Sequence, residues 1–182
     1  MFKQPFTLKT KGIALALSAL LVVTMGTPAN AQRVGKTAPD FHAVDMDSRE
    51  VWLSKLKGCG AVVYFFASWC GPCRNMTPQL IEAHRALRDK GVIFIGINLD
   101  HDEGAARSYI AQSGIPFSVI REHKDAIADA YQVRGIPQTF IISPKGEVRQ
   151  HLFGWSASYD LTSAARAVAG GKNCKVSTAV LP

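Results

Sequence analysis

Residues 65–78 of this 182-residue chain, FFASWCGPCRNMTP, decide the fold. Two cysteines, Cys70 and Cys73, stand two residues apart directly after a continuous apolar and β-branched run at 61–67. Such a run predicts a strand buried on both faces of a sheet. Apolar residues in the segment 73–90 recur with helical spacing, and a glycine follows as a C-terminal stop. The cysteine pair therefore lies where a buried strand leads into a helix.

Paired cysteines occur in zinc sites, structural disulfides and redox sites. Zinc needs four ligands, usually from two close pairs, whereas the other two cysteines, Cys59 and Cys174, stand alone and far apart. The five histidines are dispersed, and none is spaced from a cysteine as a metal site or a Cys-His catalytic pair requires. A structural disulfide between cysteines separated by only two residues is unusual at the end of a buried strand. A redox pair is the favoured interpretation.

The redox interpretation has a physical mechanism. A cysteine at the first turn of a helix faces unpaired N–H groups and the positive end of the helix dipole, which stabilise the thiolate. Cys70 fits that position as the nucleophile, and Cys73, one turn later, is placed to resolve a mixed disulfide. Gly71 permits a tight turn and Pro72 suits the start of a helix.

The rest of the chain alternates strands and helices and then ends in a hairpin and a helix. This order indicates an α/β sandwich with a mixed sheet. The patterns predict an early hairpin at 41–45 and 51–54, strands at 92–99, 117–120, 138–143 and 147–153, and helices from Asp100 or Asp102 to Ser113, at 126–131 and at 159–169.

The N-terminus has the pattern of an export signal. Three lysines precede an apolar run at 13–23, and Ala-Asn-Ala at 29–31 is a small-x-small cleavage site. We predict a cleavable signal peptide at 1–31, a single domain at 32–171 and a C-terminal tail at 172–182. The mature protein is then periplasmic or otherwise extracytoplasmic. The apolar run is short for a membrane span, so membrane contact is expected only if the signal stays uncleaved.

Composition and charge narrow the function classes. Hydrophobic residues make up 47% and charged residues 19% of the chain, which is ordinary for a globular domain. Removal of 1–31 takes away three lysines and no acidic residue, so the net charge falls from +7 to +4. The basic residues are scattered, which disfavours nucleic-acid binding. Outside the cytosol the Cys70–Cys73 pair is expected to be oxidised unless something reduces it.

The motifs resemble the thioredoxin superfamily, through WCGPC after an apolar strand, Pro78 in the following helix, and GIPQTF further along. The start VGKTAPDF, the early hairpin and the block DHDEGAARSYIAQSGIPFSVI are similar to the exported TlpA-like thiol-disulfide oxidoreductases within it. The resemblance covers roughly 34–170. It implies a thioredoxin-like three-layer sandwich with a central mixed β-sheet, an N-terminal β-hairpin and an extra strand-helix insertion.

The same resemblance implies roles for further residues. Trp69 matches the aromatic residue that flanks the nucleophile, and Pro137 matches the proline that the family holds in cis beside the cysteines. The family pairs the backbone before that proline with its substrate, so Ile136 is expected in the docking surface. No cofactor is implied beyond the redox-active Cys70–Cys73 disulfide, and no metal.

Two positions depart from the family pattern. Many thioredoxins carry a buried aspartate where this chain has Tyr64, and several TlpA-like reductases carry a glutamate where it has Met76. Such a carboxylate helps to deprotonate the second cysteine. The proton acceptor for Cys73 is therefore unassigned.

The remaining cysteines lead to a structural hypothesis. Cys59 precedes the central strand at the end of the sheet opposite Cys70, and in the thioredoxin fold the last helix also ends there. Cys174 follows that predicted helix. We expect a structural disulfide between Cys59 and Cys174. Trp52, Phe153 and Trp155 are expected to line the core or a groove.

The predicted function is an exported protein-disulfide reductase that works through a Cys70/Cys73 dithiol-disulfide cycle. The Gly-Pro dipeptide between the cysteines is the one found in thioredoxin, which favours reduction. The alternatives are a thiol oxidase or isomerase on the same fold, or a non-catalytic partner- or copper-binding module. The expected partners are client proteins with disulfides and a membrane-bound electron donor, and the protein is expected to be a monomer. Cytochrome c assembly, copper-centre assembly and general thiol protection are all compatible with this activity.

Overall fold

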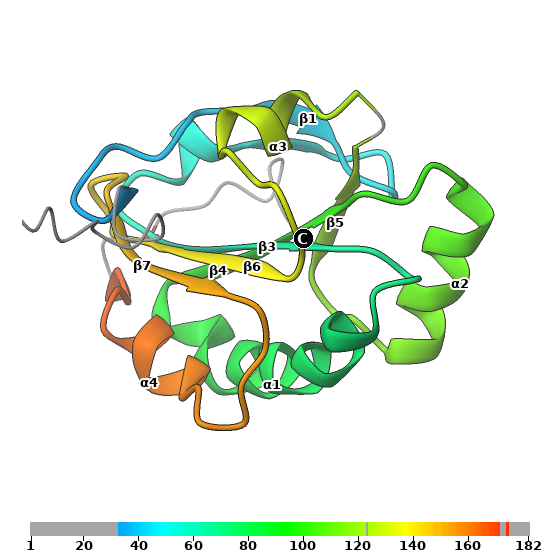
Figure 1. Cartoon of the computed structure of the whole chain (residues 1–182). Helices are drawn as coiled ribbons and strands as arrows, with labels where there is room; N and C mark the ends of the chain where they lie inside the picture. The colour runs from blue at the N-terminus through cyan, green and yellow to red at the C-terminus, as the bar shows by residue number, and fades with distance from the viewer. Residues whose placement is uncertain (1–32, 123, 172–173, 175–182) are drawn as a thin grey trace, which may run out of the picture.

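The centre of the molecule is a five-stranded mixed sheet with the strand order β5-β4-β3-β6-β7. The computed structural model describes residues 33–122, 124–171 and 174. Strand β3 pairs in parallel with β4 and antiparallel with β6, so the apolar run before the cysteines is the middle strand (Figure 1). The strands are β3 (Gly60–Phe66), β4 (Val92–Asn98), β5 (Ser118–Arg121), β6 (Gln138–Ile142) and β7 (Val148–Phe153).

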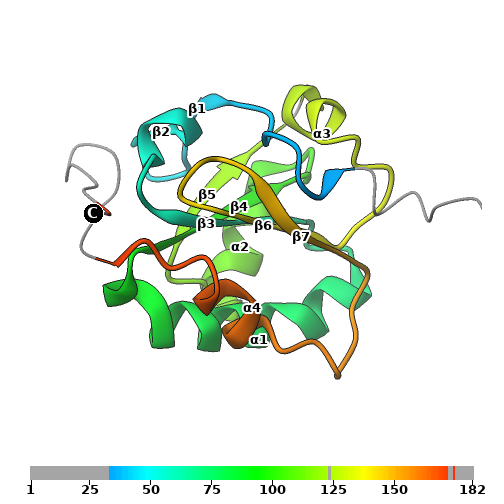
Figure 2. The same ribbon diagram turned by 90° about the vertical axis from the view of Figure 1, so that its left-hand side faces the viewer.

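Helices and a hairpin cover the two faces of this sheet. Helices α1 (Gly71–Leu87) and α4 (Leu161–Arg166) lie on one face (Figures 1 and 2). Helix α3 (Ala126–Ala130) and the antiparallel hairpin β1 (His42–Val44) and β2 (Glu50–Trp52) lie on the other. Helix α2 (Glu103–Ser113) leads into β5, which adds a parallel strand at the edge beside β4. The predicted fold class, with its hairpin and its strand-helix insertion, is confirmed.

Strand β3 shows why its residues form this middle layer. All seven of its residues are buried, and alternate side chains enter two different apolar cores. Val62, Tyr64 and Phe66 pack with α1 and α4, whereas Val63 and Phe65 pack with α3 and the N-terminal segment. An uninterrupted apolar strand is stable only where both faces are covered, which is the case here.

The element boundaries depend on specific caps. Helix α1 starts at Gly71, two residues earlier than predicted, because proline is tolerated in the first turn. It ends at Leu87, and a short 3-10 helix leads to Gly91 at φ 75°. Of the two aspartates considered for α2, Asp102 caps the helix by accepting from the Gly104 amide. Helix α4 begins two residues later than predicted, because Asp160 caps it by accepting from the Ser163 amide, and it ends at Arg166, three residues earlier than predicted.

The predicted signal peptide at 1–31 lies outside the described residues. Of the predicted tail at 172–182, only Cys174 is described. Within the part of the chain that the structure describes, no helix is long and apolar enough to cross a membrane.

Candidate active site

Cys70 and Cys73 form a disulfide at the point where β3 leads into α1. Cys70 is the N-cap of the helix, and its Sγ accepts a hydrogen bond from the Cys73 amide at 3.2 Å. Cys70 is 4% exposed and Cys73 is 0% exposed. Since only Cys70 reaches the surface and it faces the positive end of α1, it is the cysteine suited to attack an external disulfide.

The Ile136–Pro137 peptide bond is cis and lies beside the cysteines. Strand β6 pairs Gln138 with Phe65, so the residues just before β6 lie next to the residues that follow β3. Ile136 packs against the core cluster that contains both cysteines. The structure thus brings together the cysteine pair and the cis-proline loop, two segments far apart in the sequence.

Hydrogen bonds hold the cis-proline loop in place. The Gln138 side-chain amide donates to the Gly135 carbonyl at 2.8 Å, and the Pro137 carbonyl accepts from the Gly154 amide at 2.8 Å. Gln138 is 3% exposed, and its Oε1 lies 2.7 Å from Nε2 of His151. Gln138 was not identified from the sequence as a site residue, because its role depends on a turn that the pattern does not specify.

Large aromatic side chains are exposed around this site. Trp69, next to the nucleophile, is 68% exposed, and Phe153 and Trp155 are 50% and 40% exposed. Phe153 lies against the cis-proline loop, since a Cβ on Gly135 would be 3.7 Å from Cζ of Phe153. Phe153 and Trp155 are thus outside the core. Trp52 is half-buried and stacks on His42 with ring centroids 3.5 Å apart.

Hydroxyl groups, not carboxylates, surround the backbone of Cys73. The Tyr64 and Thr77 hydroxyls donate to the Cys73 carbonyl at 3.1 and 2.9 Å, and Thr77 Oγ1 lies 2.9 Å from the Tyr109 hydroxyl. Burial raises the pKa of Tyr64 well above its ordinary value, so this phenol is no base at neutral pH. Met76 is fully buried, with Thr139 Oγ1 3.8 Å from its sulfur. Within the described residues no carboxylate hydrogen-bonds to Cys73.

The rate at which Cys73 resolves a mixed disulfide is therefore expected to rise steadily between about pH 6 and pH 9. Because no described carboxylate hydrogen-bonds to Cys73, we expect water to accept its proton, and hydroxide takes that proton more readily. Acid-quench measurement of the decay of a pre-formed mixed disulfide checks this, with attack by Cys70 on a small disulfide measured in parallel as the control. A rate that is already constant below about pH 7 would contradict it.

Ser68, Asp100 and Arg74 form a polar cluster that sequence reasoning missed. The Asp100 carboxylate accepts from the Ser68 amide at 2.8 Å and from the Ser68 hydroxyl at 2.7 Å. Arg74 Nη2 donates to the Ser68 carbonyl at 2.7 Å. Asp100 was considered only as a helix cap. Asp100 is a buried carboxylate just after β4. Its contact with Ser68 can be inferred only once β4 is known to lie beside β3.

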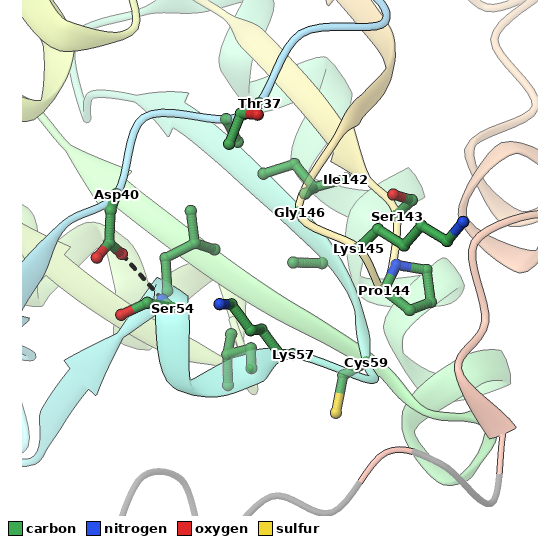
Figure 3. A pocket seen from close by; sticks show the side chains of 14 residues that line it. Thr37, Asp40, Ser54, Lys57, Cys59, Ile142, Ser143, Pro144, Lys145 and Gly146 are labelled. Atoms are coloured by element: carbon green, nitrogen blue, oxygen red, sulfur yellow. Dashed lines mark hydrogen bonds between the residues drawn. The ribbon is translucent and has the colours of Figure 1, made fainter.

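The opposite end of the sheet holds the other two cysteines. Cys59 and Cys174 form a disulfide, with their Cα atoms 4.4 Å apart and a sequence separation of 115 residues. Cys59 also lines a pocket of about 270 Å³ at this end, between the 3-10 helix Leu53–Leu56 and the β6–β7 turn (Figure 3). At its rim the Asp40 carboxylate accepts from the Ser54 amide at 2.9 Å. Cys59 precedes a strand and does not cap a helix, whereas Cys70 is the N-cap of α1, so we assign exchange with an external disulfide to the Cys70 end.

No group of three or more His, Cys, Asp and Glu side chains gathers as a metal ion would need anywhere in residues 33–122, 124–171 and 174.

Comparison with known proteins agrees with this geometry. The model of the AhpC/TSA family matches residues 34–151. The thiol-disulfide oxidoreductase ResA of Geobacillus kaustophilus is 28% identical over 162 residues, which cover 87% of this chain and 93% of the relative. The ResA of Bacillus anthracis is 30% identical over 122 residues, which cover 67% of this chain and 70% of the relative.

A solved structure shows the same fold. The crystal structure of a thiol:disulfide interchange protein of the thioredoxin family from Chlorobium tepidum superposes with a TM-score of 0.67 at 26% identity. The match covers 77% of this chain and 99% of that one.

Proposed function

The chain belongs to the AhpC/TSA family of thioredoxin-fold proteins and is a thiol-disulfide oxidoreductase, and on this premise we propose that it reduces disulfides in client proteins outside the cytosol. The observation that carries the proposal is the Cys70–Cys73 pair at the N-cap of α1, beside the cis Ile136–Pro137 bond. The export pattern at 1–31 supports the compartment, and Gly71-Pro72 between the cysteines supports the reducing direction.

The cycle has two exchange steps. The Cys70 thiolate attacks one sulfur of a client disulfide, a Cys70–client bond forms, and the other client sulfur leaves as a thiolate that takes a proton from solvent. Cys73 then loses its proton and attacks Cys70, the Cys70–Cys73 bond forms as the Cys70–client bond breaks, and the second client sulfur leaves as a thiolate that takes up a proton. Two electrons pass from the dithiol to the client. A dithiol on a membrane-bound donor restores the pair by the same exchange in reverse.

The surface around Cys70 supports a protein client. Within the described residues neither the N–H nor the C=O of Ile136 has a hydrogen-bond partner, so both are available to an extended client segment. Exposed apolar area lies close by: Trp69 precedes Cys70, Phe153 lies against Gly135, and Trp155 follows Gly154, whose amide donates to the Pro137 carbonyl. Aromatic side chains of this kind contribute much of the affinity at protein interfaces.

The redox potential of the Cys70–Cys73 pair is expected near −270 mV, as for thioredoxin, because it has the same intervening dipeptide. Equilibration in dithiothreitol or glutathione buffers, followed by thiol alkylation and peptide mapping, measures this pair separately from Cys59–Cys174. A potential above about −150 mV would assign the protein to the oxidases or isomerases instead.

A further inference from the structure

Every polar group of Ser68, the second residue before the nucleophile, is held by another residue. Its amide and hydroxyl donate to the Asp100 carboxylate, and its carbonyl accepts from Arg74. We call these contacts the Ser68 clamp. They act on the segment between the end of β3 and Cys70. Its other backbone hydrogen bonds include one from the Cys70 amide to the Ala67 carbonyl at 3.2 Å and one from the Arg74 amide to the Cys70 carbonyl at 3.3 Å.

Asp100 is itself held rigidly at the end of β4. It is 2% exposed, and its carboxylate also accepts from the Asn98 side-chain amide at 2.7 Å. The Asp100 amide donates back to Asn98 Oδ1 at 3.1 Å, and Asn98 is paired with Phe66 in the sheet register. A buried carboxylate with three charge-assisted hydrogen bonds is a firm anchor, because every alternative position leaves it unpaired.

We propose that the Ser68 clamp positions Cys70 for attack, with Asp100 as the main positioning residue. The clamp connects the rigid end of β4 to the segment that carries Trp69 and Cys70. It acts through Ser68 and does not touch the reacting sulfur. Because exchange requires three sulfur atoms in line, a displacement of Cys70 by a fraction of an ångström lowers the attack rate even when the thiolate is fully formed.

Two substitutions separate hydrogen bonding from charge. Asp100→Asn keeps the shape of the clamp: its Oδ1 accepts from the Ser68 amide and from Asn98, and its Nδ2 donates to the Ser68 hydroxyl, which then acts as acceptor. Asp100→Ala removes all three bonds. Positioning therefore predicts that the asparagine variant behaves like the parent and that the alanine variant does not.

The test uses the Cys73→Ser background and a reduction mild enough to leave the Cys59–Cys174 disulfide closed, so that Cys70 is the reacting thiol. Reduced protein is mixed with 5,5′-dithiobis(2-nitrobenzoate), and the second-order rate is followed from acid pH to its plateau at alkaline pH. The plateau reports the fully formed thiolate, and the midpoint reports its ionisation. Asp102→Ala is the matched control, since among the described residues that exposed carboxylate accepts only from the Gly104 amide.

The expected plateau rate falls at least about tenfold in Asp100→Ala and stays within about twofold in Asp100→Asn and in the Asp102→Ala control. Amide hydrogen exchange at Ser68 is expected to be faster only in the alanine variant. If Asp100→Ala does not fold, Ser68→Ala removes the hydroxyl bond to Asp100 and Arg74→Gln removes the guanidinium bond to the Ser68 carbonyl, and both are expected to lower the plateau.

The inference is overturned if Asp100→Ala, or both of the substitute variants, keep the parent plateau rate. It is also overturned if Asp100→Asn is as slow as Asp100→Ala, because charge and not position then controls the reaction. The assay reads an exchange step common to reductases and oxidases. Its outcome is therefore independent of the direction proposed above.

Discussion

A Cys73→Ser protein is expected to remain covalently joined to its clients, with Cys70 in a stable mixed disulfide. Cys70 can attack because it lies at the N-cap of α1 and reaches the surface, whereas Cys73 is fully buried behind it. In the wild-type protein Cys73 ends the complex by attacking Cys70, and serine cannot do so. The result is a change from transient intermediates to accumulation of most of the protein in complexes.

Reduced Cys73→Ser protein incubated with an oxidised extracytoplasmic extract, then alkylated and run without reductant, measures this directly. The bands should collapse to free protein on reduction, and mass spectrometry of the trapped chains identifies the client cysteines. Cys70→Ser is the matched control and should trap nothing. Trapping through Cys73 in the Cys70→Ser protein, or no complexes in either variant, would contradict the assigned order of the two cysteines.

The two cysteines and the central elements could be predicted from the sequence because their signals are local. A seven-residue apolar strand and a helix with its apolar residues on one side are both visible within short windows. The order of the strands is not local. It follows from which apolar faces are covered, so the sequence indicates a mixed sheet, and the position of β5 at the edge beside β4 comes from the structure.

Asp100 shows why part of the site could not be predicted. Two aspartates, Asp100 and Asp102, precede α2, and either is a reasonable N-cap from sequence alone. In the structure Asp102 is the N-cap of α2, whereas Asp100 accepts a hydrogen bond from Ser68, which lies 32 residues earlier in the chain. That difference exists only because β3 and β4 end side by side, as the pairing of Phe66 with Asn98 shows.

The exposed aromatics have a similar explanation. Phe153 is the last residue of β7, which lies at the edge of the sheet, and Trp155 follows it. An apolar residue at the end of an edge strand has the same sequence signature as one in the core. The three-dimensional structure is needed to show that Phe153 and Trp155 stay exposed, at the end of the sheet where Cys70 lies.

Replacing both Cys59 and Cys174 by alanine is expected to lower the free energy of unfolding by about 4 to 5 kcal/mol in the chain-entropy model. The disulfide closes a loop with a sequence separation of 115 residues, which strongly restricts the unfolded chain. It also joins the segment after α4 to the start of β3, where the Gly60 and Gly170 amides both donate to the Gly91 carbonyl at 2.9 and 3.0 Å. The fall in Tm is expected to be on the order of 10 °C.

The comparison of two double variants identifies the cause. Cys70→Ala/Cys73→Ala removes a disulfide with a sequence separation of only 3, so it is expected to cost about 2 kcal/mol or less. Urea unfolding of the oxidised proteins, monitored by circular dichroism, gives both values. The Cys59→Ala/Cys174→Ala protein should retain exchange activity while folded, because Cys70 lies at the opposite end of β3. Loss of activity without loss of stability would instead assign Cys59 and Cys174 a part in the redox cycle.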